Sequence, residues 1–283
     1  MTGMDTLLDS PGTVRRAAVA TCAALALVGV ALPATASAGS SPTSGTSPSG
    51  APAPSATAPS TTSPSTAGGS PTAVVATLSN LKTLTRYAYP ENAARAHEYP
   101  NARSRVVGTL HFLTPDGQAA VYLALRSYTA GDITWIEVPL PGRPNGRTGW
   151  VTSAALGEFH VVHEYNRVDR ETTRLTLYRD GRPIFSAPVG VGRPSLPTPS
   201  GHFYVTEKLQ SVGAPVYGPY ALGTSAYAPT LSEWPGGGVV GIHGTDEPQL
   251  IPGYPSHGCI RLRNEDITRL YPLVQVGTPI EIV

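Results

Sequence analysis

Ser256-His257-Gly258-Cys259-Ile260-Arg261-Leu262 follows His243-Gly244-Thr245 by a short loop near the C-terminus. The chain of 283 residues holds only two cysteines, and the other one, Cys22, lies in an apolar N-terminal stretch. If that stretch is removed on export, Cys259 has no cysteine partner for an internal disulfide. A lone thiol beside two histidines indicates a thiolate nucleophile that an imidazole activates.

Residues 1–38 are predicted to be a secretory signal peptide. Arg15 and Arg16 precede an apolar run over residues 17–32, which is short for a bilayer span, and residues 36–38 read Ala-Ser-Ala, a small-residue cleavage pattern. An uncleaved signal anchor is the alternative. We therefore expect an exported, extracytoplasmic protein that stays membrane-anchored if the signal is not cleaved.

Residues 39–75 consist almost wholly of Ser, Thr, Pro, Gly and Ala, and no charged side chain occurs between Ala17 and Leu81. Such a segment has little apolar surface to bury against the entropy of ordering, so we expect a disordered linker. The net charge of +1 and the pI near 7.8 give no reason to expect a nucleic-acid partner.

Residues 76–156 are predicted to form a small β domain. Short runs rich in β-branched and aromatic residues occupy 105–110, 121–125 and 134–138, with turn sequences at 114–117 and 129–132. The segment from Trp135 to Trp150 resembles bacterial SH3-like modules. Trp135 and Trp150 either stack on a ligand or belong to the core, and we favour the core.

Residues 157–283 are predicted to form a second, mainly β domain with little helix. Strands are expected over 175–178, 183–187, 203–206, 239–242 and 278–283. Asp180-Gly181 between two of these runs indicates a hairpin. The 239–242 strand delivers His243 at its end, and Asn264 is expected to cap a short helix.

This second domain resembles the catalytic domain of the L,D-transpeptidases, the enzymes that cross-link bacterial cell walls. The residues that carry the resemblance are His243, Ser256, His257, Gly258, Cys259, Ile260, Arg261 and Asn264. Residues 198–203 (Thr-Pro-Ser-Gly-His-Phe) and 218–222 (Gly-Pro-Tyr-Ala-Leu) also resemble family segments. The resemblance implies a β-sandwich catalytic domain and acyl transfer through a cysteine.

Each step of acyl transfer has a candidate residue. Cys259 is the nucleophile and His243 the general base, its imidazole oriented by a backbone carbonyl because the next residue is Gly244. The amides of Gly258 and Cys259 are candidates for an oxyanion hole. His257 is an alternative base, because residues 257 and 259 point the same way if they lie in a strand.

Four residues are candidates for binding the substrate. Arg261 can hold a stem carboxylate through its planar guanidinium, with an internal salt bridge as its alternative role. The resemblance adds Ser256, Asn264 and Tyr220. No cofactor is expected.

The resemblance implies peptidoglycan stem peptides as both donor and acceptor, cross-links of the 3-3 type, and reaction with carbapenem-type inhibitors. Three other interpretations stay open. In the first, water replaces the acceptor amine, and the same site acts as an L,D-carboxypeptidase. In the second, His243, His257 and Cys259 are zinc ligands, although no zinc motif accompanies them and no metal is predicted. In the third, the protein is a non-catalytic wall-binding module.

Overall fold

A computed structural model describes residues 73–210, 214–231 and 235–283. The predicted signal peptide and nearly all of the predicted linker lie outside the described residues. The described residues belong to one compact unit that ends at Val283. No helix among them is long and apolar enough to cross a membrane.

The upstream part of the chain forms a six-stranded antiparallel sheet in the order β1-β6-β7-β8-β3-β4. Its strands are β1 (Val74–Thr77), β3 (Arg95–His97), β4 (Val106–Thr109), β6 (Arg126–Ala130), β7 (Ile133–Pro139) and β8 (Thr148–Thr152). Trp135 and Trp150 are both buried, as the core interpretation predicts. The SH3-like assignment stays a prediction.

A second, three-stranded sheet joins the upstream part to the segment that enters the downstream part. Its strands are β5 (Tyr122–Ala124), β2 (Thr85–Ala88) and β9 (His160–Val162), in the order β5-β2-β9. A small core beside this sheet contains Val121, Leu123 and Val162 together with Tyr204 from the downstream part. The two parts of the chain therefore share buried apolar contacts.

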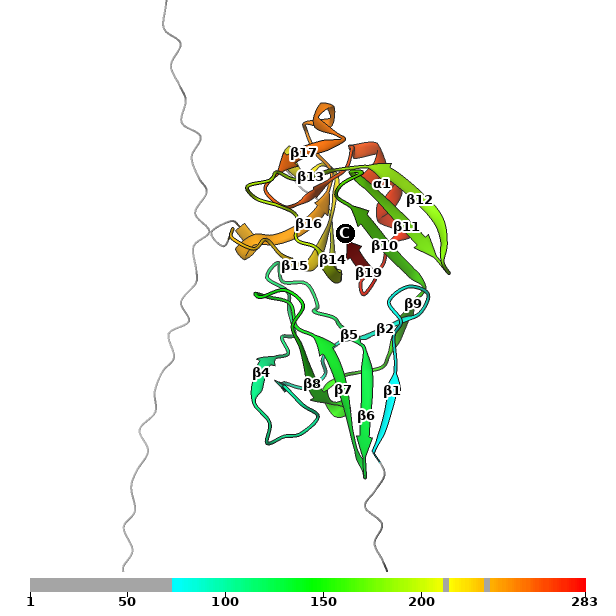
Figure 1. Cartoon of the computed structure of the whole chain (residues 1–283), viewed down its shortest axis with the longest axis vertical. Helices are drawn as coiled ribbons and strands as arrows, with labels where there is room; N and C mark the ends of the chain where they lie inside the picture. Colours follow the sequence, from blue (N-terminus) through cyan, green and yellow to red (C-terminus); the bar gives the residue numbers. More distant parts are fainter. Residues whose placement is uncertain (1–72, 211–213, 232–234) are drawn as a thin grey trace, which may run out of the picture. The chain divides into compact units, whose positions relative to one another are not determined.

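The downstream part is a ten-stranded mixed sheet in the order β12-β11-β10-β19-β14-β15-β16-β18-β13-β17 (Figure 1). Its strands are β10 (Glu164–Asp169), β11 (Arg174–Arg179), β12 (Arg182–Pro188), β13 (Gly190–Gly192), β14 (Gly201–Gln210), β15 (Tyr220–Tyr227), β16 (Val239–His243), β17 (Gly253–Ser256), β18 (Ile260–Arg261) and β19 (Pro279–Ile282). A sheet of this width curls on itself, because each strand is twisted relative to its neighbour. Buried side chains from β11 and from β16 consequently share one core with the only α-helix of the described residues, α1 (Asn264–Leu270).

The mainly β prediction is confirmed. The structure also tests the predicted hairpin at Asp180-Gly181 and the predicted helix cap at Asn264. Asp180 and Gly181 both have positive φ, 50° and 75°, and connect β11 to β12, as the hairpin prediction requires. The predicted cap is wrong by one residue, since Arg263 is the N-cap of α1 and makes no side-chain cap bond.

The remaining short elements are the 3₁₀ turns η1 (Ser153–Ala155), η2 (Pro215–Tyr217), η3 (Pro235–Gly238), η4 (Pro248–Leu250) and η5 (Tyr271–Leu273).

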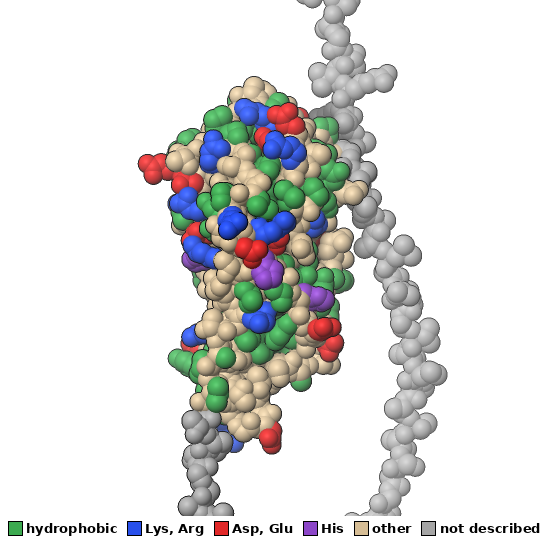
Figure 2. Space-filling view, turned by 90° about the vertical axis from the view of Figure 1, so that its right-hand side faces the viewer, with side chains coloured by type: hydrophobic (Ala, Val, Ile, Leu, Met, Phe, Trp, Pro, Cys, Tyr) green, Lys and Arg blue, Asp and Glu red, His purple; other side chains and the backbone are tan. Residues whose placement is uncertain are grey.

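On the face drawn in Figure 2, basic and acidic side chains lie interspersed, with hydrophobic side chains scattered among them. In two ion pairs of the described residues, a half-exposed arginine meets a buried carboxylate: Arg179 Nε lies 2.6 Å from Glu164 Oε1, and Arg126 Nε lies 2.6 Å from Glu137 Oε2. Because both carboxylates are buried, loss of either arginine would leave a buried charge without its partner.

Candidate active site

Two neighbouring parallel strands bring the predicted catalytic residues together. In the register of β16 and β18, Ile242 pairs with Ile260 and His243 pairs with Arg261. Both isoleucines are fully buried in the core. Because side chains alternate along a strand, His243 and Arg261 face the opposite side from that core.

Cys259 directly precedes β18 and lies beside Gly241 of β16. The Gly241 amide donates to the Cys259 Sγ at 3.5 Å. A methyl group at Gly241 would lie 3.7 Å from Cδ2 of His243, so the imidazole reaches back over this glycine. A pocket of about 50 Å³ opens at this point, and its lining includes Tyr217, His243, Ser256, His257, Cys259 and Arg261.

The turn that presents Cys259 is fixed by two buried hydroxyls. The Ser256 hydroxyl donates to the Cys259 carbonyl at 2.6 Å and accepts from the Gly258 amide at 3.1 Å. The Thr198 hydroxyl donates to the Gly258 carbonyl at 2.8 Å and accepts from the Gly192 amide at 2.8 Å. Gly258 has a φ of 125°, a conformation that a residue with a side chain avoids.

This arrangement changes two expectations from the sequence. Residues 257–259 form a bend between β17 and β18, so the argument that His257 and Cys259 share one face of a strand fails. The Gly258 amide is already bonded to Ser256, which leaves the Cys259 amide as the oxyanion-hole candidate of the predicted pair. Ser256 is 1% exposed and acts on the backbone of the turn.

His243 is held in one tautomer by the chain itself. Its Nδ1 lies 2.6 Å from the Gly244 carbonyl, which can only accept, so Nδ1 carries the proton and Nε2 keeps its lone pair. The ring of Tyr217 packs edge-on against the imidazole, with centroids 5.0 Å apart. Burial, reinforced by the nearby Arg261, lowers the pKa of His243 to about 4.

Cys259 is neutral in the same environment. Burial raises the pKa of its thiol, and the Gly241 amide and Arg261 offset only part of that effect. Since the imidazole pKa falls while the thiol pKa rises, the resting pair is thiol and neutral imidazole.

Arg261 forms an internal salt bridge, which is the alternative that the sequence analysis gave to binding a substrate carboxylate. Its Nη1 donates to Glu247 at 2.8 Å, and its side chain is only 13% exposed. Its Nε is buried and has no hydrogen-bond partner among the described residues. One edge of the guanidinium is thus occupied by Glu247, while the Nε–H remains unused beside the pocket.

The other predicted site residues lie around the pocket or behind it. His257 lines the pocket, and burial together with Arg193 and Arg261 lowers its pKa. The side-chain Oδ1 of Asn264 accepts from the Thr245 amide at 2.9 Å, and a side chain at Gly244 would collide with it. Tyr220 stacks on Tyr271 with centroids 4.4 Å apart. Asn264 therefore contacts the segment that directly follows His243, and neither Asn264 nor Tyr220 is among the residues that line the pocket.

Residues of the upstream part also shape the site, and sequence reasoning missed them. The Arg143 guanidinium donates to the carbonyls of Ala228, Leu231 and Gly237 at 2.8–2.9 Å. The Asn145 side chain bonds both the amide and the carbonyl of Tyr227, at 3.0 and 2.8 Å. Ala228 and Leu231 line the Cys259 pocket. We call Arg143 and Asn145 the clamp, because they hold one wall of the pocket from 82 or more residues away in sequence.

A metal interpretation finds no support in the arrangement of ligands. Within the ranges that the structure describes, no three His, Cys, Asp or Glu side chains lie close enough to hold a metal ion. His243 instead directs Nδ1 to a backbone carbonyl.

Comparisons with known proteins identify the family. The L,D-transpeptidase catalytic domain matches residues 164–282. A putative L,D-transpeptidase of Bacillus subtilis, YkuD, is 30% identical over 164 residues, which cover 58% of this chain and 85% of the relative. A probable L,D-transpeptidase of Escherichia coli K12, YbiS, is 28% identical over 216 residues, covering 68% and 69% of the two chains.

Among solved structures, the catalytic domain of an E. faecium L,D-transpeptidase is 28% identical, covers 42% of this chain and 95% of its own, and has a TM-score of 0.33. The same kind of domain acylated by ertapenem is also 28% identical, covers 44% of this chain and 99% of its own, and has a TM-score of 0.34. With the matched domain spanning the Cys259 pocket, and a B. subtilis relative aligned over most of its length, this chain belongs to the L,D-transpeptidase family.

Proposed function

We propose that this protein is a cysteine-dependent L,D-transpeptidase that joins peptidoglycan stem peptides through a thioester on Cys259, forming cross-links of the 3-3 type. The observation that carries the proposal is the tautomer of His243. Its Nδ1 is committed to the Gly244 carbonyl, so the lone pair on Nε2 is available in the pocket that also contains Cys259. A base and a thiol in one small pocket are the minimum that acyl transfer needs.

The first half-reaction forms the thioester. His243 Nε2 accepts the thiol proton as the Cys259 sulfur attacks the carbonyl of the donor peptide, and the Cys259 amide stabilises the oxyanion that develops. The carbon–nitrogen bond then breaks. The amine of the terminal D-alanine takes the proton from His243, and D-alanine departs. The donor acyl group remains on the Cys259 sulfur as a thioester.

The second half-reaction forms the cross-link. The amine of an acceptor stem attacks the thioester, its proton passes to His243, and the thiolate leaves and is reprotonated. The energy of the original amide bond is kept in the thioester, so no nucleotide is consumed. Arg261 can offer its unused Nε–H to a carboxylate or carbonyl of the substrate.

We propose that the catalytic part works outside the cytoplasm, where the cell wall is assembled; the sequence pattern of residues 1–38, typical of a secretory signal peptide, supports this location. We expect the linker to work as a tether, either after signal cleavage or from an uncleaved anchor.

The decisive test incubates the protein from residue 39 onward with disaccharide-tetrapeptide muropeptides and identifies the products by mass. A cross-linked dimer that has lost one D-alanine supports the transpeptidase. Conversion to the tripeptide monomer alone indicates an L,D-carboxypeptidase, and no product from folded protein contradicts both. Cys259→Ser is the matched control and should give neither product, because an unactivated hydroxyl is a much weaker nucleophile. Activity that a metal chelator abolishes would contradict the cysteine mechanism.

Carbapenems provide an independent test of the thiol. A strained lactam should acylate Cys259 once per chain, as expected for the family, and intact-protein mass measures the adduct. The wild-type protein should gain a single carbapenem mass and Cys259→Ser none. A folded wild-type protein without an adduct would contradict the assignment of Cys259 as the nucleophile.

A further inference from the structure

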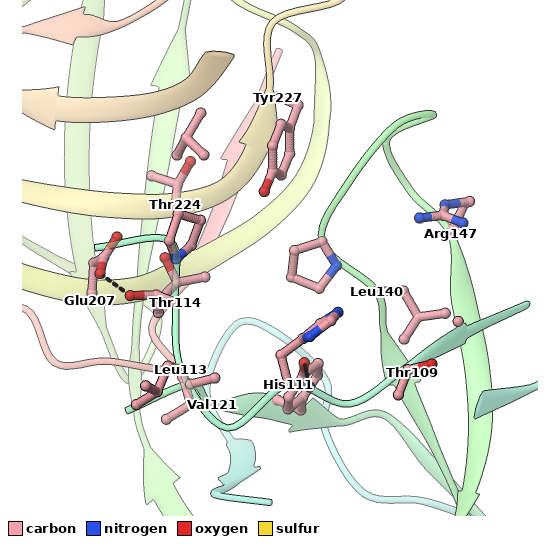
Figure 3. Close-up of a pocket in the computed structure, with 17 residues that line it drawn as sticks. Thr109, His111, Leu113, Thr114, Val121, Leu140, Arg147, Glu207, Thr224 and Tyr227 are labelled. Carbon is pink, nitrogen blue, oxygen red and sulfur yellow. Dashed lines mark hydrogen bonds between the residues drawn. The ribbon is translucent and has the colours of Figure 1, made fainter. Parts of the chain in front are cut away.

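A second pocket, of about 440 Å³, lies between loops of the upstream part and strands β14 and β15 (Figure 3). It is far larger than the Cys259 pocket, and the two share only Val239 among their lining residues. Leu113, Val121 and Leu140 supply apolar walls. Volumes of about 300–1,000 Å³ are typical of small-molecule sites.

One end of this pocket carries a buried carboxylate. Glu207 is only 3% exposed, and its Oε2 accepts from the Thr114 hydroxyl at 2.5 Å, as Figure 3 shows. None of the ion pairs of the described residues includes Glu207. Burial raises the pKa of Glu207, and Asp116 adds to that effect. A buried carboxylate of this kind is stabilised by a cation that enters the pocket.

The other end carries a guanidinium with an unused donor. Arg147 lies across the pocket from Glu207 in Figure 3. Its Nη1 donates to the Val107 carbonyl at 3.3 Å, but its Nε is buried without a hydrogen-bond partner among the described residues. Guanidinium N–H groups suit carboxylates, which accept two such bonds at once.

We propose that this pocket binds a short peptide with free termini, its ammonium group at Glu207, its carboxylate at Arg147 and small apolar side chains between them. The buried Glu207 carboxylate and the buried Nε–H of the half-buried Arg147 have opposite charge and lie at opposite ends, so a zwitterion satisfies both at once. The Tyr227 hydroxyl borders the space between them and can bond an amide group of a peptide. This inference is independent of the chemistry proposed at Cys259.

The first experiment changes the ligand and leaves the protein intact. Trialanine, N-acetyl-trialanine and trialanine amide are titrated into the wild-type protein by calorimetry. We expect saturable binding of one trialanine per chain, weakened about tenfold or more when either terminus is blocked, since each block removes a charge-assisted hydrogen bond in a buried site. No binding by folded protein, or equal binding of all three peptides, would overturn the proposal.

The second experiment assigns each terminus to its partner. With Glu207→Gln, acetylation of the peptide should no longer weaken binding, whereas amidation still should; Arg147→Gln should give the reverse. Glu265→Gln, at an exposed carboxylate on α1, is the matched control and should bind like the wild type. Methyl NMR on the wild type locates the peptide without any variant. Shifts at Val121 and Leu140 are expected, and shifts confined to residues of the Cys259 pocket would overturn the proposal.

Discussion

At the scale of single residues, the two histidines of the pocket differ in what they contact. His243 is buried and fixed by the Gly244 carbonyl, whereas His257 sits in the bend before Cys259 and is only half-buried. We expect His243→Ala to slow acylation of Cys259 by about 10²–10⁴-fold, the usual contribution of a general base. His257→Asn should cost much less. Stopped-flow acylation by a carbapenem measures both variants, and the reverse ranking would make His257 the base.

The low pKa of His243 also makes a prediction for stability. Unfolding restores the imidazole to its ordinary pKa near 6.5, so between pH 6.5 and about 4 the unfolded state binds more protons than the folded state. The contribution of His243 to the free energy of unfolding is therefore fully present above pH 6.5. It falls by on the order of 3 kcal/mol as the pH drops toward 4. Denaturant unfolding at a series of pH values measures it.

The matched control for that experiment is His243→Gln, which keeps a polar side chain but cannot titrate. Its stability should fall less steeply over the same pH interval, because only the other titrating groups remain. Identical slopes for the two proteins would contradict the low pKa of His243 in the folded state.

At the scale of elements, the sequence predicts the strands that carry the site better than the turns between them. The apolar run before His243 forms β16, as predicted. The hairpin predicted from Asp180-Gly181 connects β11 to β12. Asn264 fails as a cap because its side-chain Oδ1 accepts from the Thr245 amide, a contact between residues 19 apart that no local pattern shows. The turn at Gly258 depends on Thr198 in the same way.

The clamp gives the prediction that belongs to this scale. Arg143→Ala removes three hydrogen bonds from the segment that contains Ala228 and Leu231, so this wall of the Cys259 pocket loses its restraint. We expect the acylation rate to fall several-fold to tenfold with little change in the carbapenem adduct finally formed, since Cys259 and His243 stay in place. Arg105→Ala, which removes an exposed pair with Glu98, is the control and should acylate like the wild type. A wild-type rate for Arg143→Ala would mean that the wall is held without the clamp.

At the scale of the whole molecule, composition and motif separate the chain into an upstream and a downstream part, but nothing in the sequence shows how many contacts join them. The Tyr204 hydroxyl of β14 donates to the Val121 carbonyl at 3.0 Å, and Tyr204 is 1% exposed. Val162 in β9 pairs with Thr85 in β2. Such contacts form only when both parts are folded, so local patterns cannot predict them.

The last prediction follows from those shared contacts. A fragment of residues 158–283 loses the partners of Tyr204 and Val162, as well as the clamp, and exposes apolar surface that is buried in the intact chain. Uncovering two such side chains costs roughly 3–5 kcal/mol. Scanning calorimetry should therefore show one cooperative transition for the chain from residue 73 onward and a clearly lower melting temperature for the fragment. The chain from residue 39 onward is the control and should show the same transition as the chain from residue 73, because residues 39–72 offer almost no large apolar side chain for packing. Two separate transitions in the intact chain, or a fragment that melts at the same temperature, would mean that the upstream and downstream parts fold independently and that the shared core adds little to the stability of the catalytic part.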